Sequence, residues 1–146
     1  MDEVEIYIGQ SLEGPRTGYG FYIYILQKEG SNKTLTDTGD GDNYTAHSLE
    51  VMALIDALRR FKRPCKLKVH SAHGWLKQIW VNGWLEKWQT ADWKNTKGKE
   101  VANADLLREL SAILTEKEHE ILEMDCDLKD YTKWMEFQIE KQRRKM

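Results

Sequence analysis

The side chains best suited to chemistry in this chain are carboxylates and histidines at the ends of expected helices and strands. Glu50 falls early in an expected helix, and Asp125 and Asp127 follow an expected strand. Their oxygens could bind one divalent cation, and His70 and His73 flank the end of a neighbouring strand. Histidines at such positions are more often hydrogen-bonded structural residues than ligands. We therefore expect no metal site and keep Glu50, Asp125 and Asp127 as weak candidates.

Two other polar groups have simpler interpretations. Ser71 lies two residues from His73, but this spacing establishes no hydrogen bond between them, and no orienting acid is evident. The acidic run 40–42 is typical of a solvated turn. Neither pattern predicts a nucleophile or a metal site.

The elements that position these side chains follow from the spacing of apolar residues. Alternation and β-branched content predict strands over 4–8, 21–26, 33–40, 65–71 and 119–126. Helical spacing predicts helices over 46–61, 73–84, 103–117 and 133–144, with Thr45 as the N-cap of the first. The polar stretch 88–100 is expected to be a loop. This order predicts an α/β fold with a mixed sheet of five strands flanked by helices.

Composition limits the function classes. With 146 residues, 40% of them hydrophobic, the chain fits a single domain over 1–146. The net charge of -2 leaves nucleic-acid binding to local basic patches. Cys65 and Cys126 stand in unrelated segments, so neither a disulfide nor a zinc site is expected. No apolar run is long enough to span a membrane, and we expect a soluble cytoplasmic protein with no membrane partner.

Several motifs resemble type 1 ribonuclease H over nearly the whole chain, from Val4 to about Ile139. They are "GP" before "GYG" within 14–20, "LEVMALIDAL" from Leu49, and "WVNGWLEKWQTADWKNTKGKEVANADLL" from Trp80. The resemblance implies a ribonuclease H-like fold with a tryptophan- and lysine-rich protrusion at about 80–102. It also implies hydrolysis of the RNA strand of an RNA/DNA hybrid by two magnesium ions, which only a cluster of carboxylates can hold together.

The catalytic carboxylates of that family are largely missing from this chain. Glu50 matches the helical glutamate, but Gly9 and Ser71 occupy two aspartate positions, and Thr132 or Lys133 occupies the fourth. The histidine-containing loop before the last helix is also absent from the sequence. We therefore expect a catalytically degenerate pseudoenzyme that needs no cofactor, with Mg²⁺ or Mn²⁺ required only if residual activity exists.

The features that the resemblance assigns to nucleic-acid binding are better retained. They are Trp84, Lys87, Trp88, Trp93, Lys94, Lys97 and Lys99. Lysines contact phosphates as point charges, and tryptophans stack on sugars or anchor the protrusion. We expect core packing to matter more for Trp80 and Trp84 than for Trp88 and Trp93. The basic tail at 140–146 is either a second phosphate contact or a solvated end.

Specificity for the hybrid is open, because Ala46 and His47 stand where the family has asparagines that sense RNA 2′-hydroxyls. The favoured hypothesis is a degenerate domain that binds RNA/DNA hybrid or another duplex, such as double-stranded RNA, without efficient cleavage. One alternative is a module for a protein partner or a homo-oligomer. The other is a metal-dependent ribonuclease H with a rearranged site using Glu50, Asp125 or Asp127.

Overall fold

The structure is a computed structural model that describes residues 1–14 and 17–145. Pro15 of the "GP" motif and Met146 of the basic tail lie outside the described residues. The strands are β1 (Asp2–Gln10), β2 (Gly18–Lys28), β3 (Thr34–Tyr44), β4 (Cys65–Ser71) and β5 (Glu120–Asp125). The helices are α1 (Ala46–Leu58), α2 (Trp75–Val81), α3 (Trp84–Thr90), α4 (Ala104–Glu116) and α5 (Thr132–Lys145), with a short 3₁₀ turn η1 (Lys129–Tyr131).

The five strands form one sheet in the order β3-β2-β1-β4-β5. β1 pairs antiparallel with β2 and parallel with β4, so the central strand joins the hairpin part of the sheet to the parallel part. β4 pairs parallel with β5, which ends the sheet. The predicted α/β fold with a five-stranded mixed sheet is confirmed.

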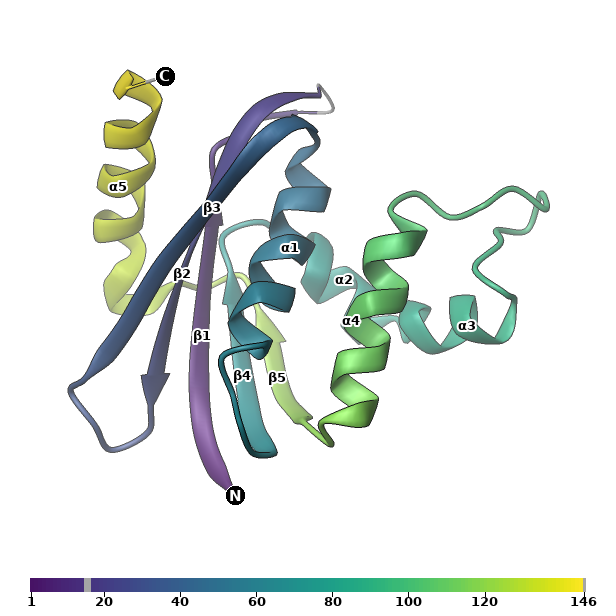
Figure 1. Ribbon diagram of the computed structural model, residues 1–146, viewed down its shortest axis with the longest axis horizontal. Coiled ribbons are helices and arrows are strands. Elements are labelled where there is room, and N and C mark those ends of the chain that lie inside the picture. Colours follow the sequence, from purple (N-terminus) through teal and green to yellow (C-terminus); the bar gives the residue numbers. More distant parts are fainter. Residues whose placement is uncertain (15–16, 146) are drawn as a thin grey trace.

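Helices cover both faces of the sheet (Figure 1). α1 and α4 lie on one side, over a large core that includes Ile6, Ile8 and Leu54. α5 lies alone on the other side, over a smaller core that includes Tyr7, Ile23 and Met135. Because successive strand residues point to opposite faces, β1 contributes to both cores in alternation. β1 is therefore buried on both sides.

The start of α1 confirms the predicted cap. The backbone N–H of Ser48 donates to Thr45 Oγ1 at 3.1 Å, and the backbone N–H of Thr45 donates to Ser48 Oγ at 2.7 Å. This reciprocal capping satisfies two amide groups that the helix itself leaves unbonded. α1 ends at Leu58 rather than at Phe61, because the last amides bond three residues back and tighten the chain into a turn.

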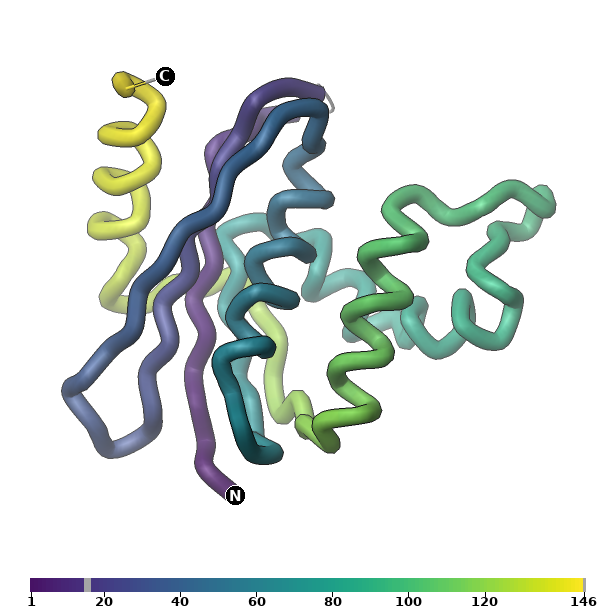
Figure 2. Tube along the Cα trace, in the orientation of Figure 1, coloured from purple at the N-terminus to yellow at the C-terminus, as the bar shows by residue number. Residues whose placement is uncertain are grey.

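The region after β4 departs from the sequence prediction. The single helix expected over 73–84 is split at Gly83, whose φ of 63° is left-handed and separates α2 from α3. α3 takes up the first part of the expected loop over 88–100. α3 and the segment that follows it project away from the sheet, as the tube in Figure 2 shows. The last helix, expected over 133–144, is α5 over Thr132–Lys145, so the basic residues within Glu140–Lys145 lie on its last turns.

None of the helices in the described ranges is long and apolar enough to cross a membrane.

Candidate functional site

Glu50 lies inside the protein, where α1 meets the end of β4. Its side chain is fully buried, and the hydroxyl of Ser71 donates to Glu50 Oε1 at 2.6 Å. The backbone N–H of Leu76 points at the same oxygen at 3.3 Å. Glu50 Oε2 is buried and has no hydrogen-bond partner within the described part of the chain. The one retained family acid therefore contacts two neutral donors.

This environment favours the neutral carboxyl. Burial raises the pKa of Glu50 to about 7, although the hydrogen bonds from Ser71 and Leu76 act in the opposite direction. Because the side chain is fully buried and Oε1 is already bonded to Ser71 and Leu76, Glu50 presents no open oxygen to a cation in this arrangement. Ser71 adds a hydroxyl to this pair where the family has a second carboxylate.

Gly9 lies near the end of β1, beneath α5. A Cβ atom built on Gly9 would lie 2.5 Å from Met135 Sδ and 2.7 Å from Met135 Cγ. Met135 is itself buried, at 1% exposure, so α5 packs directly on the backbone of β1. The position of the family's first aspartate therefore has no room for a side chain in this arrangement.

The remaining family position falls on Thr132 or Lys133 at the start of α5. Thr132 is exposed and donates its hydroxyl to the backbone carbonyl of Lys129 at 2.8 Å. Lys133 is also exposed, and its ammonium group would repel a cation. Neither residue supplies a carboxylate.

The other expected acid, Asp125, belongs to a separate polar cluster on the α5 side of the sheet. The fully buried His70 ring lies between two carboxylates. Its Nδ1 is 2.7 Å from Asp125 Oδ1, and its Nε2 is 3.0 Å from Glu5 Oε1. Lys129 Nζ donates to the same Glu5 oxygen at 3.0 Å, and the Tyr7 ring stacks on His70. Both imidazole nitrogens face carboxylates, so His70 bridges Glu5 of β1 and Asp125 of β5.

The pKa values of the two carboxyls agree with this interpretation. Burial alone would raise the pKa of Glu5, but hydrogen bonds from Lys129 and His70 lower it overall. Burial likewise opposes ionisation of Asp125, and hydrogen bonds from His70 and the Asp127 amide outweigh it and lower the pKa. The cluster is an ion-paired structural network across three strands. Sequence reasoning missed Glu5, although a charge between the strand residues Val4 and Ile6 was the available signal.

The three weak metal candidates Glu50, Asp125 and Asp127 do not lie around one point in the structure. Ser71 and His70 are consecutive in β4, so the Ser71–Glu50 pair and the His70–Asp125 pair lie on opposite faces of the sheet. Asp127 accepts a hydrogen bond from the Lys129 backbone and caps the turn before η1. In residues 1–14 and 17–145, no three His, Cys, Asp or Glu side chains are grouped so that they could hold a metal ion.

The tryptophans of the protrusion divide into packed and exposed rings. Trp84 and Trp88 are half-buried and lie 5.6 Å apart between ring centroids. Trp93 is 6% exposed and lies in the core, with the Arg108 guanidinium over its ring at 5.8 Å. The expectation that Trp93 contacts a nucleic acid is therefore corrected, because no ligand can reach a ring buried in this way. Trp80, expected to pack, is 41% exposed.

The four lysines expected to bind phosphate, Lys87, Lys94, Lys97 and Lys99, are all exposed. Among the described residues, none of them forms an ion pair with an acid. Asn95 Oδ1 accepts the backbone N–H groups of Lys97 and Lys99 at 2.9 and 3.1 Å, which holds the turn that presents both lysines. Among the described residues, the protrusion therefore displays positive charge without acidic partners, from Lys87 on α3 and from Lys94, Lys97 and Lys99 on the loop that follows.

A mixed sheet in this strand order, with one helix on its far face and a helical protrusion, defines a ribonuclease H-like α/β protein. The ribonuclease H family model matches residues 2–123. The ribonuclease H of Thermoanaerobacter sp. (strain X514) is 34% identical over 121 residues, which cover 83% of this chain and 75% of that protein. The chain belongs to the ribonuclease H family.

Solved structures share the fold at low sequence identity. A foamy viral protease-reverse transcriptase in complex with dsDNA is 13% identical with a TM-score of 0.70, over 95% of this chain and 89% of that one. A ribonuclease H1 in complex with RNA/DNA hybrid is 16% identical with a TM-score of 0.61, over 89% of each chain. Together these matches confirm the ribonuclease H-like fold that the sequence predicts.

The buried carboxyl predicts a pH dependence of stability. A free glutamate titrates near 4.5 and Glu50 near 7, so the unfolded state loses its proton first as the pH rises. The free energy of unfolding should therefore fall between these two pH values, by about 3 kcal/mol. Glu50→Gln should lack this fall, as measured by urea unfolding at several pH values. The exposed Glu116→Gln variant is the control, and parallel profiles for Glu50→Gln and wild type would contradict the prediction.

The contact between α5 and β1 predicts that restoring the first family acid destabilises the fold. Gly9→Asp forces Met135 aside and buries a carboxylate without a cation, which should cost roughly 2–4 kcal/mol of unfolding free energy. Gly74→Asp is the matched control, because nothing lies within 4 Å of a Cβ there. Thermal and urea unfolding of both variants make the comparison. Equal stability of the two variants would show that α5 moves away from Gly9 at little cost.

Proposed function

We propose that this chain is a catalytically degenerate ribonuclease H-like domain that binds duplex nucleic acid, with RNA/DNA hybrid as the first candidate. The observation that carries the proposal is the combination of a closed acid site with an open basic protrusion. Met135 fills the space beside Gly9, while the four protrusion lysines stay exposed and unpaired among the described residues. Binding and cleavage depend on different parts of the molecule, so one can persist without the other.

The residues at the family positions do not fit two divalent cations. Two such ions repel strongly and need several ionised oxygens around them. This chain offers one buried glutamate whose pKa is raised to about 7, a serine hydroxyl, a glycine beneath a methionine, and Thr132 or Lys133. We therefore assign no catalytic step to Glu50 and propose a structural role for it.

Support for duplex binding comes from electrostatics and from similar proteins. Exposed lysines that lack acidic partners release counterions when they meet phosphates, which drives binding at low salt. Two proteins with the same fold have been solved with RNA/DNA hybrid and with dsDNA. The candidate contacts on this chain are Lys87, Lys94, Lys97 and Lys99, together with the half-buried Trp84 and Trp88.

Anisotropy titration of labelled RNA/DNA hybrid at several salt concentrations tests this proposal. Replacing Lys94, Lys97 and Lys99 by Gln should weaken binding and lower the slope of log affinity against log salt by up to about three. Replacing Lys33, Lys62 and Lys117 removes the same charge from exposed positions outside the protrusion and should change the slope much less. Absence of salt-dependent affinity in the wild type would instead favour the alternative of a protein-interaction module.

A cleavage assay tests the degenerate acid site separately. Labelled hybrid incubated with excess protein in Mg²⁺ or Mn²⁺ should remain intact, because the residues present cannot hold the ions in position. Glu50→Gln is measured beside the wild type as a control for contaminating nuclease. Cleavage by the wild type that disappears in Glu50→Gln would overturn the proposal and favour an enzyme with a rearranged site.

A further inference from the structure

The outer face of α5 carries two exposed aromatic rings. Trp134 is 37% exposed and Phe137 is 64% exposed, whereas Met135 is buried against the sheet. Side chains three residues apart lie side by side on a helix, so the two rings are neighbours. Tyr131 packs edge-on against Trp134 at 6.4 Å between ring centroids and supports it from η1. Two adjacent rings that face solvent form a candidate contact surface.

Cations are interleaved with these rings. Phe137 has a lysine four residues away on each side, Lys133 and Lys141, and both are exposed. Neither lysine forms an ion pair with an acid in the described part of the chain. Arg144 continues the same face one turn further on and pairs with Glu140 at 3.6 Å. Since α5 carries five basic side chains and two acidic ones, its outer face attracts anions.

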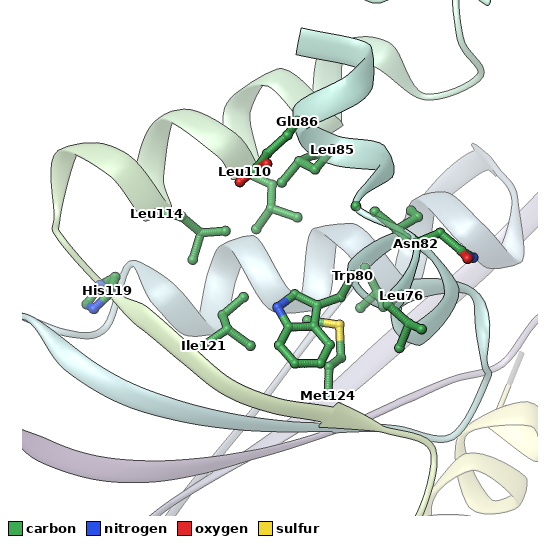
Figure 3. Close-up of a pocket in the computed structure, with 13 residues that line it drawn as sticks. Leu76, Trp80, Asn82, Leu85, Glu86, Leu110, Leu114, His119, Ile121 and Met124 are labelled. Carbon is green, nitrogen blue, oxygen red and sulfur yellow. The ribbon is translucent and has the colours of Figure 1, made fainter. Parts of the chain in front are cut away.

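The exposed Trp80 has different surroundings. It lines an apolar cleft between α2, α3, α4 and β5, where it lies near Met124 and Ile121 (Figure 3). Among the described residues that line this cleft, Glu86 is the one acidic side chain, and none is a lysine or an arginine. A phosphate beside Trp80 would therefore meet a carboxylate without a cation to offset it. The rings of α5 differ from Trp80 in having free ammonium groups beside them.

The charge and composition of this face select its partner. Symmetric pairing of two copies through α5 would bring like charges together. A membrane-binding helix needs a broad apolar face, but Met135 and Ile139 of α5 pack against the sheet. A single nucleic-acid strand complements both features of the face, because its phosphates pair with cations and its unstacked bases stack on aromatic rings. Bases within a duplex are already stacked on one another, so the rings favour a single strand.

We propose that the outer face of α5 binds single-stranded nucleic acid. The bases stack on Trp134 and Phe137, and the phosphates pair with Lys133 and Lys141. Figure 1 shows α5 on the opposite side of the sheet from α4 and α3, so this surface is separate from the protrusion. The inference rests on the proposed function in taking nucleic acid as the ligand, but it uses none of the protrusion lysines.

The test compares two probes with the same phosphates, an oligothymidylate of about eight nucleotides and an abasic strand of equal length. Chemical-shift titration of the full chain should move the Trp134 indole N–H and the Lys141 amide saturably. Oligothymidylate should bind there about tenfold more tightly than the abasic strand, because each stacked base adds affinity. Equal affinities for the two strands, or no saturable shift on α5, overturn the proposal. Shifts with anionic lipid vesicles but not with oligothymidylate also overturn it and identify a membrane surface.

Substitutions on α5 locate the site. Trp134→Ala combined with Phe137→Ala should reduce the affinity for oligothymidylate, followed at the Lys141 amide, to that for the abasic strand. Leu35→Ala is the control, because it removes an exposed apolar side chain from β3 and should bind like the wild type. All these side chains face solvent, and circular dichroism checks that the variants fold. Wild-type affinity in the double alanine variant overturns the proposal.

The same variants separate this inference from the proposed duplex binding. The double alanine variant on α5 should keep the wild-type affinity for a blunt RNA/DNA hybrid. Replacing Lys94, Lys97 and Lys99 by Gln should leave the oligothymidylate shifts on α5 unchanged. Hybrid binding without a single-strand response on α5 contradicts this inference alone, and the reverse result contradicts the proposed function alone.

Discussion

The contact between Met135 and the backbone of Gly9 sets the arrangement of the α5 side of this molecule. A thioether lies where the first atom of a side chain would be, so α5 packs closer to β1 than any residue but glycine allows. Met135 thereby joins Tyr7 in the smaller of the two cores. Further along α5, Arg143 donates to the backbone carbonyl of Ser11 at 2.6 Å and ties the helix to the chain after β1. The packing of one helix thus occupies the space that a carboxylate would need.

Glu50 on α1 and His70 on β4 are both fully buried and show opposite solutions to the cost of burying an ionisable group. Glu50 is bonded only by neutral donors, and burial raises its pKa to about 7. His70 bonds the carboxylates of Glu5 and Asp125, and the Lys129 ammonium pairs with Glu5, so these acids have hydrogen-bonded and charged partners. The sheet separates the two groups, because Ser71 and His70 point to opposite faces. Glu5 and Asp125 bond to His70, and Glu50 bonds to Ser71, so these acids do not surround a common point.

The protrusion is built from elements that the acid site does not use. Trp93 anchors its loop in the core beside Arg108, and Asn95 shapes the turn that carries Lys97 and Lys99. None of these contacts involves β1 or α5. The conformation of the basic loop therefore does not depend on which residue occupies position 9. This separation gives a physical basis for the proposed function, in which phosphate binding does not depend on a metal site.

The five strands, the Thr45 cap and the family could be predicted from the sequence, because local periodicity, capping chemistry and motifs are properties of neighbouring residues. The sequence also identified Gly9 and Ser71 as non-acidic. Three facts could not be predicted from the sequence: Met135 covers Gly9, Trp93 is buried while Trp80 is exposed, and Glu50 and Asp125 lie on opposite faces of the sheet. These facts depend on how α5 and α4 pack and on strand register, which bring together residues far apart in the chain. The split of the expected helix at Gly83 lies between the two cases, since the glycine was visible but its left-handed φ was not.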